Sequence, residues 1–463
     1  MNHPVNPAHD DTRGAPATRL VYIPTNRPFE AAFRSVVAEV AAVRKSSSDD
    51  VRLLVIDDCS PEDSRRNRDL TERAGREHGC DIHVLTPRDW QRLADEIVAT
   101  AGLPPADAAA ARSALVKPTG SYGAGPNKAA LVAAFTGAAS LHRRDSDQLT
   151  GVDPRSGWSP LHVESRLLDP APGPVRPETA AYCVGSSLTG ESTRDRRDLQ
   201  HDDPDFARRI DDLSKPPPGA QRLPSVPAPV PGRITVGDGV RVERDDTGTV
   251  EMGIAALRTV YEWIPEMPAV GVLGSDYFQK GLLYQLALPV LHHELRAHHV
   301  YEEWRAEQSD ARHLGWYALA ELRYSILRFH WNAFNEKVKA HRGQLLLADG
   351  GFDSPAYGEL FLDALREGAD RAARLPHTYV AIYKEAAATA TGDVRDRLDV
   401  RVAALEGAVD SAPRDIADAV EEFAGLVRLW PTLTSAAART GERHGRRLGL
   451  WQAAGPSRTE EKR

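Results

Sequence analysis

Residues 51–60 read V-R-L-L-V-I-D-D-C-S. The first six are mostly apolar, and two carboxylates, Asp57 and Asp58, follow directly, which predicts a buried β-strand that ends in acidic residues. Similar apolar runs lie at 19–24 and 82–85, and helical patterns separate the three runs. Strand, helix, strand, helix, strand is the order of a parallel sheet with crossover helices, so the sequence predicts an α/β fold.

Composition limits the classes of function. The chain has 463 residues, of which 41% are hydrophobic and 27% charged, as is typical of a soluble protein with two or three domains. The formal net charge is −8. Because no basic field surrounds such a chain, we expect no nucleic-acid partner.

Cysteine usage and hydropathy predict the compartment. Cys59, Cys80 and Cys183 are odd in number and widely spaced, which argues against a disulfide scaffold or a zinc site and favours a reducing environment. The N-terminal residues lack the apolar core of a signal peptide, and no run of 18 apolar residues predicts a membrane span. We therefore expect a cytoplasmic protein, whose oligomeric state the sequence leaves open.

The C-terminal third has a helical pattern. Apolar residues such as Trp316, Leu319 and Leu322 recur at spacings of three and four, which predicts amphipathic helices. Pro413 and Pro431 are expected to end helical segments.

These patterns predict a domain organisation. A stretch rich in proline inside the α/β part is either a plain linker or a functional loop such as a lid. The predicted parts are a disordered lead (1–18), an α/β domain (19–300) with its Pro-rich loop (215–233), a helical C-terminal domain (301–455) and a frayed tail (456–463).

Two acidic pairs suggest a cation site. Asp57 and Asp58 end a predicted strand, and Asp145 and Asp147 form a D-x-D triplet after an alanine-rich helix. Like charges this close repel, and a divalent cation reverses that cost. Since Mg²⁺ and Mn²⁺ share carboxylates with substrate phosphates, the pairs also suggest a phosphate-bearing substrate. A solvated turn is the alternative for either pair alone.

The order of the motifs resembles a known family, the GT-A glycosyltransferases, and most closely their inverting, family-2-like members. The resemblance spans residues 20–280. It rests on the first strand V-Y-I-P-T-N-R-P (21–28), the strand end V-I-D-D-C-S (55–60), the helix G-A-G-P-N-K-A-A-L-V-A-A (123–134), the D-x-D motif R-D-S-D-Q (144–148) and the acceptor-side motif L-G-S-D-Y-F (273–278).

This resemblance implies a fold and an activity. The fold would be a GT-A-type, Rossmann-like mixed sheet flanked by helices, with an α-helical C-terminal region. The activity would be transfer of a sugar from a nucleoside-diphosphate donor to a small or soluble acceptor, with inversion and with Mn²⁺ or Mg²⁺ as cofactor.

The resemblance also implies roles for individual residues. Pro24, Thr25 and Arg27 would line the nucleotide site, Asp57 and Asp58 would contact the base or ribose, and Asn127 or Lys128 would lie near the donor phosphates. Asp145 and Asp147 would hold the metal against the diphosphate, and Asp276 would be the general base.

A histidine cluster, H-H-E-L-R-A-H-H (292–299), offers a further metal ligand. It lacks the H-E-x-x-H spacing of a zincin helix. Some GT-A enzymes supply a late histidine to the metal, so His292 or His293 is expected in that role. The alternative is that these are ordinary core or surface histidines.

A second reading is a catalytically inactive GT-A-like protein that binds nucleotide sugars or serves as a scaffold. Ser275 stands where the family has Glu, and Pro126 and Lys128 depart from the helix motif. A dinucleotide-binding fold is disfavoured because G-x-G-x-x-G does not follow the first strand.

Overall fold

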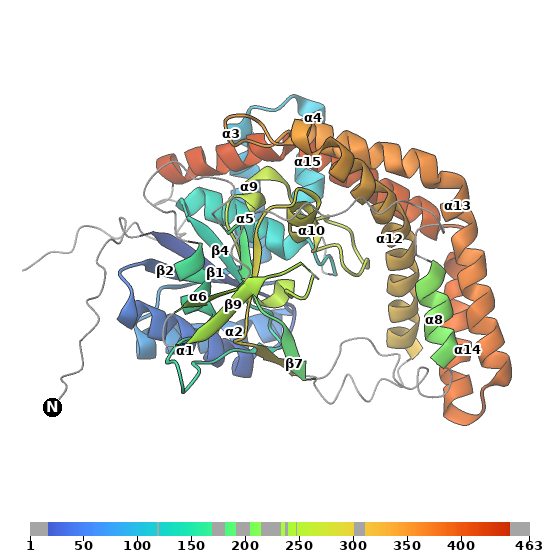
Figure 1. The fold of residues 1–463 in the computed structure, drawn as a ribbon, viewed down its shortest axis with the longest axis horizontal. Helices are drawn as coiled ribbons and strands as arrows, with labels where there is room; N and C mark the ends of the chain where they lie inside the picture. Colours follow the sequence, from blue (N-terminus) through green and yellow to red (C-terminus); the bar gives the residue numbers. More distant parts are fainter. Residues whose placement is uncertain are drawn as a thin grey trace, which may run out of the picture.

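Figure 1 shows the computed structural model of the chain. It describes residues 17–117, 120–168, 181–190, 204–213, 233–236, 239–246, 248–300 and 311–444. Three predicted segments lie wholly or almost wholly outside these ranges, namely the lead (1–18), the Pro-rich loop (215–233) and the tail (456–463).

Three parallel strands form the first half of a sheet. They are β1 (Thr18–Thr25), β2 (Asp50–Asp57) and β3 (Ile82–Leu85). Alternate residues of β1 face opposite sides: Val21 and Ile23 lie in one apolar cluster, and Leu20 and Tyr22 lie in another. Because both faces are covered, the strand reads as one continuous apolar run. The predicted α/β arrangement is confirmed in this half.

The first crossover helices are α1 (Glu30–Ser46) and α2 (Pro61–His78). The hydroxyl of Ser60 caps α2 by accepting from the Asp63 N–H at 3.2 Å, and Pro61 begins the helix. Gly79 ends it with φ of +61°, which glycine adopts without steric cost.

The whole sheet is mixed and has nine strands. Their order is β3-β2-β1-β4-β10-β6-β11-β9-β8, and β10 runs antiparallel to both β4 and β6. A second, three-stranded sheet has the order β5-β12-β7. The further strands are β4 (Ser140–Arg143), β5 (Gln148–Leu149), β6 (Cys183–Gly185), β7 (Leu188–Gly190), β8 (Arg233–Val236), β9 (Val240–Arg244), β10 (Ala255–Leu257), β11 (Val290–His293) and β12 (Ala297–His299).

Helices cover both faces of the large sheet (Figure 1). The helices α1 and α2 pack on one face, and α3, α5 and the C-terminal helix α15 (Ala412–His444) pack on the other. The further helices of this part are α3 (Pro87–Ala101), α4 (Pro105–Leu115), α5 (Ala124–Thr136), α6 (Pro160–Leu167), α8 (Pro204–Leu213), α9 (Val260–Trp263) and α10 (Phe278–Gln285).

The C-terminal region is helical, as predicted. It comprises α12 (Ala311–Leu345), α13 (Ser354–Thr389), α14 (Gly392–Ala408) and α15 (Ala412–His444). The prediction that Pro431 ends a segment is wrong, because Pro431 lies inside α15. Its neighbours Trp430 and Leu433 are fully buried, so packing outweighs the hydrogen bond that proline removes.

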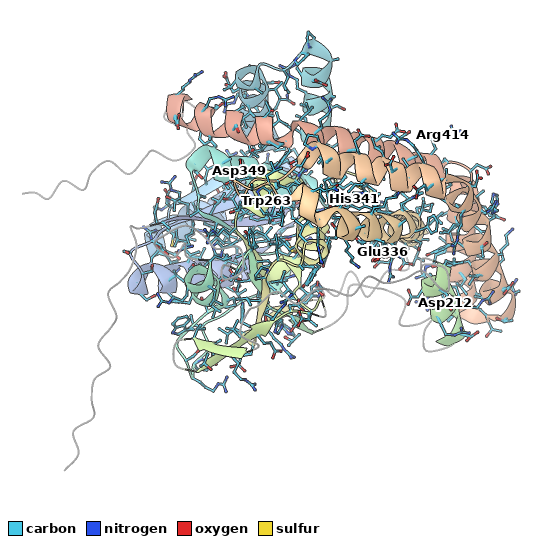
Figure 2. All side chains as sticks on the ribbon, turned by 45° about the horizontal axis from the view of Figure 1, so that its top comes forward. Asp212, Trp263, Glu336, His341, Asp349 and Arg414 are labelled. Carbon is cyan, nitrogen blue, oxygen red and sulfur yellow. The ribbon has the colours of Figure 1, made fainter. Side chains whose placement is uncertain are left out.

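One hydrophobic core joins the helical region to the α/β part. Trp263 stacks on Phe352 with ring centroids 5.4 Å apart, where the two parts meet (Figure 2). The indole of Trp430 donates to the Tyr261 carbonyl at 2.8 Å. Among the residues placed here, no helix has the length and apolar character needed to cross a bilayer.

Candidate active site

The carboxyl ends of β1 and β2 bring five predicted residues to one edge of the sheet. Pro24 and Thr25 pair in register with Ile56 and Asp57, and the Asp58 N–H donates to the Thr25 carbonyl at 2.9 Å. The Thr25 hydroxyl donates to the carbonyl of Arg27 at 2.7 Å. Ligands of open α/β sheets bind at this edge, so the positions suit a binding site.

The helix α5 contributes Asn127 and Lys128, which have different partners. Lys128 is buried and donates to both carboxylate oxygens of Asp58, at 2.7 and 2.8 Å. The side chain of Asn127 donates to the Glu266 carbonyl at 2.8 Å and accepts from the Glu266 N–H at 2.7 Å. Lys128 therefore positions Asp58, and Asn127 fixes the segment that leads to Asp276.

Arg143, at the end of β4, connects the D-x-D motif to Asp276. Its Nε lies 2.7 Å from Asp145 Oδ1, and its Nη1 lies 2.8 Å from Asp276 Oδ2. The guanidinium is almost wholly buried. Burial raises the pKa of Asp145, and the charge of Arg143 offsets part of that effect. Arg143 was missed in the sequence, although two consecutive arginines, Arg143 and Arg144, directly before the D-x-D triplet were a visible signal.

Asp147 lies between a histidine and an arginine. Its Oδ2 is 3.6 Å from Nε2 of His299 and 3.8 Å from Nη1 of Arg27. Burial works against ionisation, but the hydrogen bond with His299 and the charge of Arg27 lower the pKa of Asp147. Two carboxylates one residue apart thus differ in the direction of their pKa shifts.

The histidine beside Asp147 is His299, where the sequence suggested His292 or His293. The strands β5 and β12 pair Gln148 with His299, and the Val300 N–H donates to the Asp147 carbonyl at 2.8 Å. His292 and His293 lie on β11, in register with Glu243 and Val242 of β9. His299 belongs to the same histidine cluster, so the signal was present but the chosen member was not the one beside Asp147.

The donor set around Asp147 suits a hard or borderline divalent cation. A carboxylate and an imidazole are ligands that Mn²⁺ accepts, and Mg²⁺ takes the carboxylate. As the side chains stand, no three His, Cys, Asp or Glu residues within the described ranges gather closely enough to hold an ion.

Glu266 is a second residue that sequence reasoning missed. Its carboxylate accepts from the Phe278 N–H at 2.6 Å and from the Gln279 N–H at 3.2 Å. It therefore caps α10 directly after Asp276. The visible signal was a lone acidic residue in the apolar stretch W-I-P-E-M-P-A-V (263–270), where a charge is costly without partners.

Glu266 should make stability depend on pH. Complete burial and the nearby charge of Asp276 raise the pKa of Glu266 to about 8 from its ordinary 4.5. Because the folded pKa exceeds the unfolded one, stability falls as pH rises from 4.5 through 8. Chemical denaturation measures the free energy of unfolding at pH 6 and at pH 9. Between these two pH values it should fall by about 2 kcal/mol more in the wild type than in Glu266→Gln. Equal losses in both proteins would contradict this assignment.

A buried ionic network anchors the backbone under the D-x-D motif. Arg144 makes two 3.0 Å bonds to Glu39 on α1 and a third to Glu164 on α6. His142 hydrogen-bonds the same Glu164 at 2.8 Å. All four side chains have no exposed surface. Burial opposes ionisation of Glu164, but Arg144 and His142 lower its pKa to about 2.

Comparison with known proteins places the chain in one family, whose model matches most of its length. A family model described as "Family of unknown function (DUF6271)" matches residues 19–446. The chain belongs to the DUF6271 family. The match covers the site and the helical C-terminal region alike, so α12 to α15 are part of what the DUF6271 family shares.

Two further comparisons, with curated proteins and with solved structures, do not establish the function of the chain. No curated protein matches this DUF6271 chain. Among solved structures, it is similar to the mannosyltransferase PcManGT from Pyrobaculum calidifontis in complex with GDP-Man and Mn2+, with 11% identity and a TM-score of 0.36 over 85% of this chain and 87% of that chain. That TM-score is too low to establish a shared fold, and the function proposed below rests on the chain's own residues.

Proposed function

We propose that the chain is a metal-dependent glycosyltransferase of GT-A type. It moves a sugar from a nucleoside-diphosphate donor to a small or soluble acceptor, with inversion at the anomeric carbon. The observation that carries the proposal is the joining of Asp145 and Asp276 by the guanidinium of Arg143, with Asp147 and His299 next to them. Donor-side and acceptor-side carboxylates thus share one site.

On the donor side, Asp58 contacts the base or ribose, and Pro24, Thr25 and Arg27 line the nucleotide. The neighbouring Asp57 has no exposed surface and accepts from the Cys59 N–H at 3.2 Å, so it holds the turn that presents Asp58. Asp147 and His299 would hold Mn²⁺ or Mg²⁺, with Asp145 two positions before Asp147. The ion, when bound, supplies charge that stabilises the departing diphosphate. Lys128 acts indirectly, by holding the Asp58 carboxylate in place.

On the acceptor side, Asp276 removes the proton of the attacking hydroxyl. Arg143 engages its Oδ2 and so fixes the carboxylate relative to the D-x-D motif. A carboxylate within about 3 Å of a hydroxyl can serve as a general base. Attack from the side opposite the diphosphate inverts the anomeric carbon.

One observation favours a second function, binding of a nucleotide sugar without turnover. Arg143 already compensates the charges of Asp145 and Asp276, as a cation would. Donor hydrolysis without acceptor separates the two functions, because only a working transferase releases free sugar in a metal-dependent way.

Nucleotide binding is the direct test of the donor side. We expect one nucleoside diphosphate, screened by thermal unfolding, to stabilise the protein only when Mn²⁺ is present. At about 100 times its Kd a ligand contributes about 2.7 kcal/mol. His299→Ala should lose the Mn²⁺-dependent part of this stabilisation, and the matched control His292→Ala should keep it. A metal-dependent shift that survives in His299→Ala but not in His292→Ala would reverse the assignment.

A further inference from the structure

Exposed apolar side chains gather beside the candidate site. Among the residues that the structure describes, five large hydrophobic side chains are exposed, and three of them, Tyr122, Val270 and Trp316, lie on adjoining segments. Ser121 pairs with Val270, and the Gly271 N–H donates to the Gly120 carbonyl at 3.0 Å. We call these three residues the apolar strip.

Trp316 joins the apolar strip from α12. A Cβ built on Gly271 would lie only 3.9 Å from Nε1 of Trp316, so the loop and the helix are in close contact there. The ring of Tyr317 lies 6.3 Å from that of Trp316. The helical region therefore supplies aromatic surface next to a loop of the α/β part.

One end of the apolar strip reaches the carboxylates. A Cβ built on Gly123, the residue after Tyr122, would collide with the carbonyl of Met267, so the backbone beside Tyr122 packs closely against the segment that leads to Asp276. Val270 lies on the loop that the Met267 N–H closes by donating to the Ser275 carbonyl at 3.0 Å. Since Asp276 follows this loop directly, the strip and the proposed base belong to one local unit.

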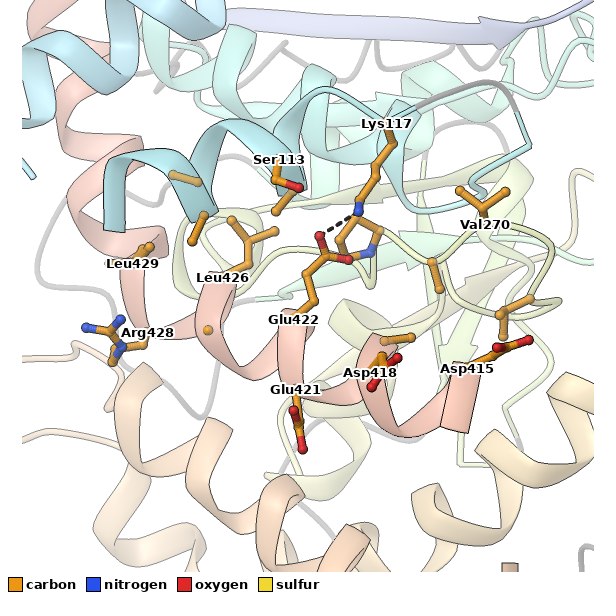
Figure 3. Close-up of a pocket in the computed structure, with 18 of the residues that line it drawn as sticks. Ser113, Lys117, Val270, Asp415, Asp418, Glu421, Glu422, Leu426, Arg428 and Leu429 are labelled. Atoms are coloured by element: carbon orange, nitrogen blue, oxygen red, sulfur yellow. Dashed lines mark hydrogen bonds and ion pairs between the residues drawn. The ribbon is translucent and has the colours of Figure 1, made fainter. Parts of the chain in front are cut away.

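The other end of the apolar strip borders a cavity of about 810 Å³ between α4, α15 and this loop (Figure 3). Val270 belongs to both the strip and the cavity wall. The volume lies in the range that holds small organic ligands. Its apolar lining includes Ala110, Ala114, Ala269, Val272, Leu426 and Leu429.

The charges around the cavity select against anions. Each basic residue of its lining already has a carboxylate partner, so none offers an uncompensated positive charge to an anionic ligand. The pairs are Lys117 with Glu422 at 2.5 Å, Arg323 with Asp415 at 2.8 Å and Arg428 with Asp107 at 2.7 Å.

We propose that the apolar strip and this cavity bind the acceptor, and that the acceptor carries an uncharged apolar group. The inference rests on the proposed function. The acceptor hydroxyl gives its proton to Asp276, its oxygen bonds to the anomeric carbon, and the bond from that carbon to the diphosphate breaks. The apolar group lies over Tyr122, Val270 and Trp316 and enters the cavity, where it loses contact with water.

Two matched probes test this with the full-length protein. They are methyl β-D-glucoside and n-octyl β-D-glucoside, the latter below its micelle concentration. Each glucoside is added to the protein together with the nucleotide sugar that the protein hydrolyses. We expect the octyl glucoside to halve the rate of hydrolysis, or to replace hydrolysis by transfer, at a concentration at least tenfold lower than the methyl glucoside requires. A tenfold preference corresponds to about 1.4 kcal/mol.

Three variants and one control locate the effect. Trp316→Ala and Val270→Ser should abolish the octyl preference, and Ala110→Phe, which fills the cavity, should reduce it. Leu347→Ser removes another exposed apolar side chain and should leave the preference unchanged. The far-UV circular dichroism spectrum and the thermal unfolding midpoint of all four variants should match those of the wild type, which shows that the variants fold.

The outcomes separate the inference from the proposed function. Equal potency of the two glucosides in the wild type, or an octyl preference that survives in both Trp316→Ala and Ala110→Phe, would overturn the inference alone. If the protein consumes no nucleotide sugar and no nucleotide shifts its unfolding, the proposed function fails and the inference falls with it.

Discussion

Asp276→Asn is expected to lower kcat by about 10²–10⁴-fold, the contribution typical of a positioned general base. The amide has nearly the same shape but does not accept the acceptor proton. Donor binding should remain close to wild type, because Asp276 contacts Arg143 and not the residues proposed to hold the nucleotide. The measurement is the rate of transfer at saturating donor and Mn²⁺, with donor Kd determined in parallel.

The control for this variant is Asp370→Asn, which changes an exposed carboxylate on α13 and should leave kcat unchanged. Arg143→Met is the informative companion, since it removes the guanidinium that fixes Asp276. Turnover of Asp276→Asn within about tenfold of wild type would assign the base elsewhere.

Arg144→Met should have the largest effect on stability, with a loss of about 3–5 kcal/mol. The substitution keeps much of the side-chain volume but leaves Glu39 and Glu164 without their cation inside the protein. Buried carboxylates without a partner pay the full cost of desolvation. Urea denaturation of the wild type and the variant measures the difference.

Two controls show whether burial is the reason. Arg66→Met breaks an ion pair of similar length, 2.7 Å, in which both side chains are about two-thirds exposed, and it should change stability by less than about 1 kcal/mol. Replacing Glu39 and Glu164 by Gln in the Arg144→Met background should recover part of the loss. A loss for Arg144→Met no larger than that for Arg66→Met would show that the network is dispensable.

The sequence was sufficient to predict the elements of the fold that local patterns decide. Apolar runs that end in polar residues predict the strands β1, β2 and β3. The same pattern places Asp57 and Asp58 at the carboxyl end of β2. The helix α4 begins at Pro105 and ends at Leu115, and its start is visible in the sequence because proline favours the first helical turn.

The sequence was insufficient to predict contacts between residues that lie far apart along the chain. The strand β4 contains His142 and Arg143, whose burial depends on Glu164 and Asp276, and no local pattern reveals that pairing. The choice of His299 over His292 depends on the pairing of β12 with β5. The roles of the predicted site residues remain predictions, although the structure brings most of these residues to one edge of the sheet.

The contacts of α15 bear on how the chain acquires its structure during synthesis. Glu422 pairs with Lys117, 305 residues earlier, and Thr440 hydrogen-bonds Thr100, 340 residues earlier. The face of the sheet that α3 and α5 cover therefore stays incomplete until α15 has left the ribosome. A nascent chain that ends before residue 412 exposes apolar surface that α15 would bury, and such chains are natural substrates for chaperones.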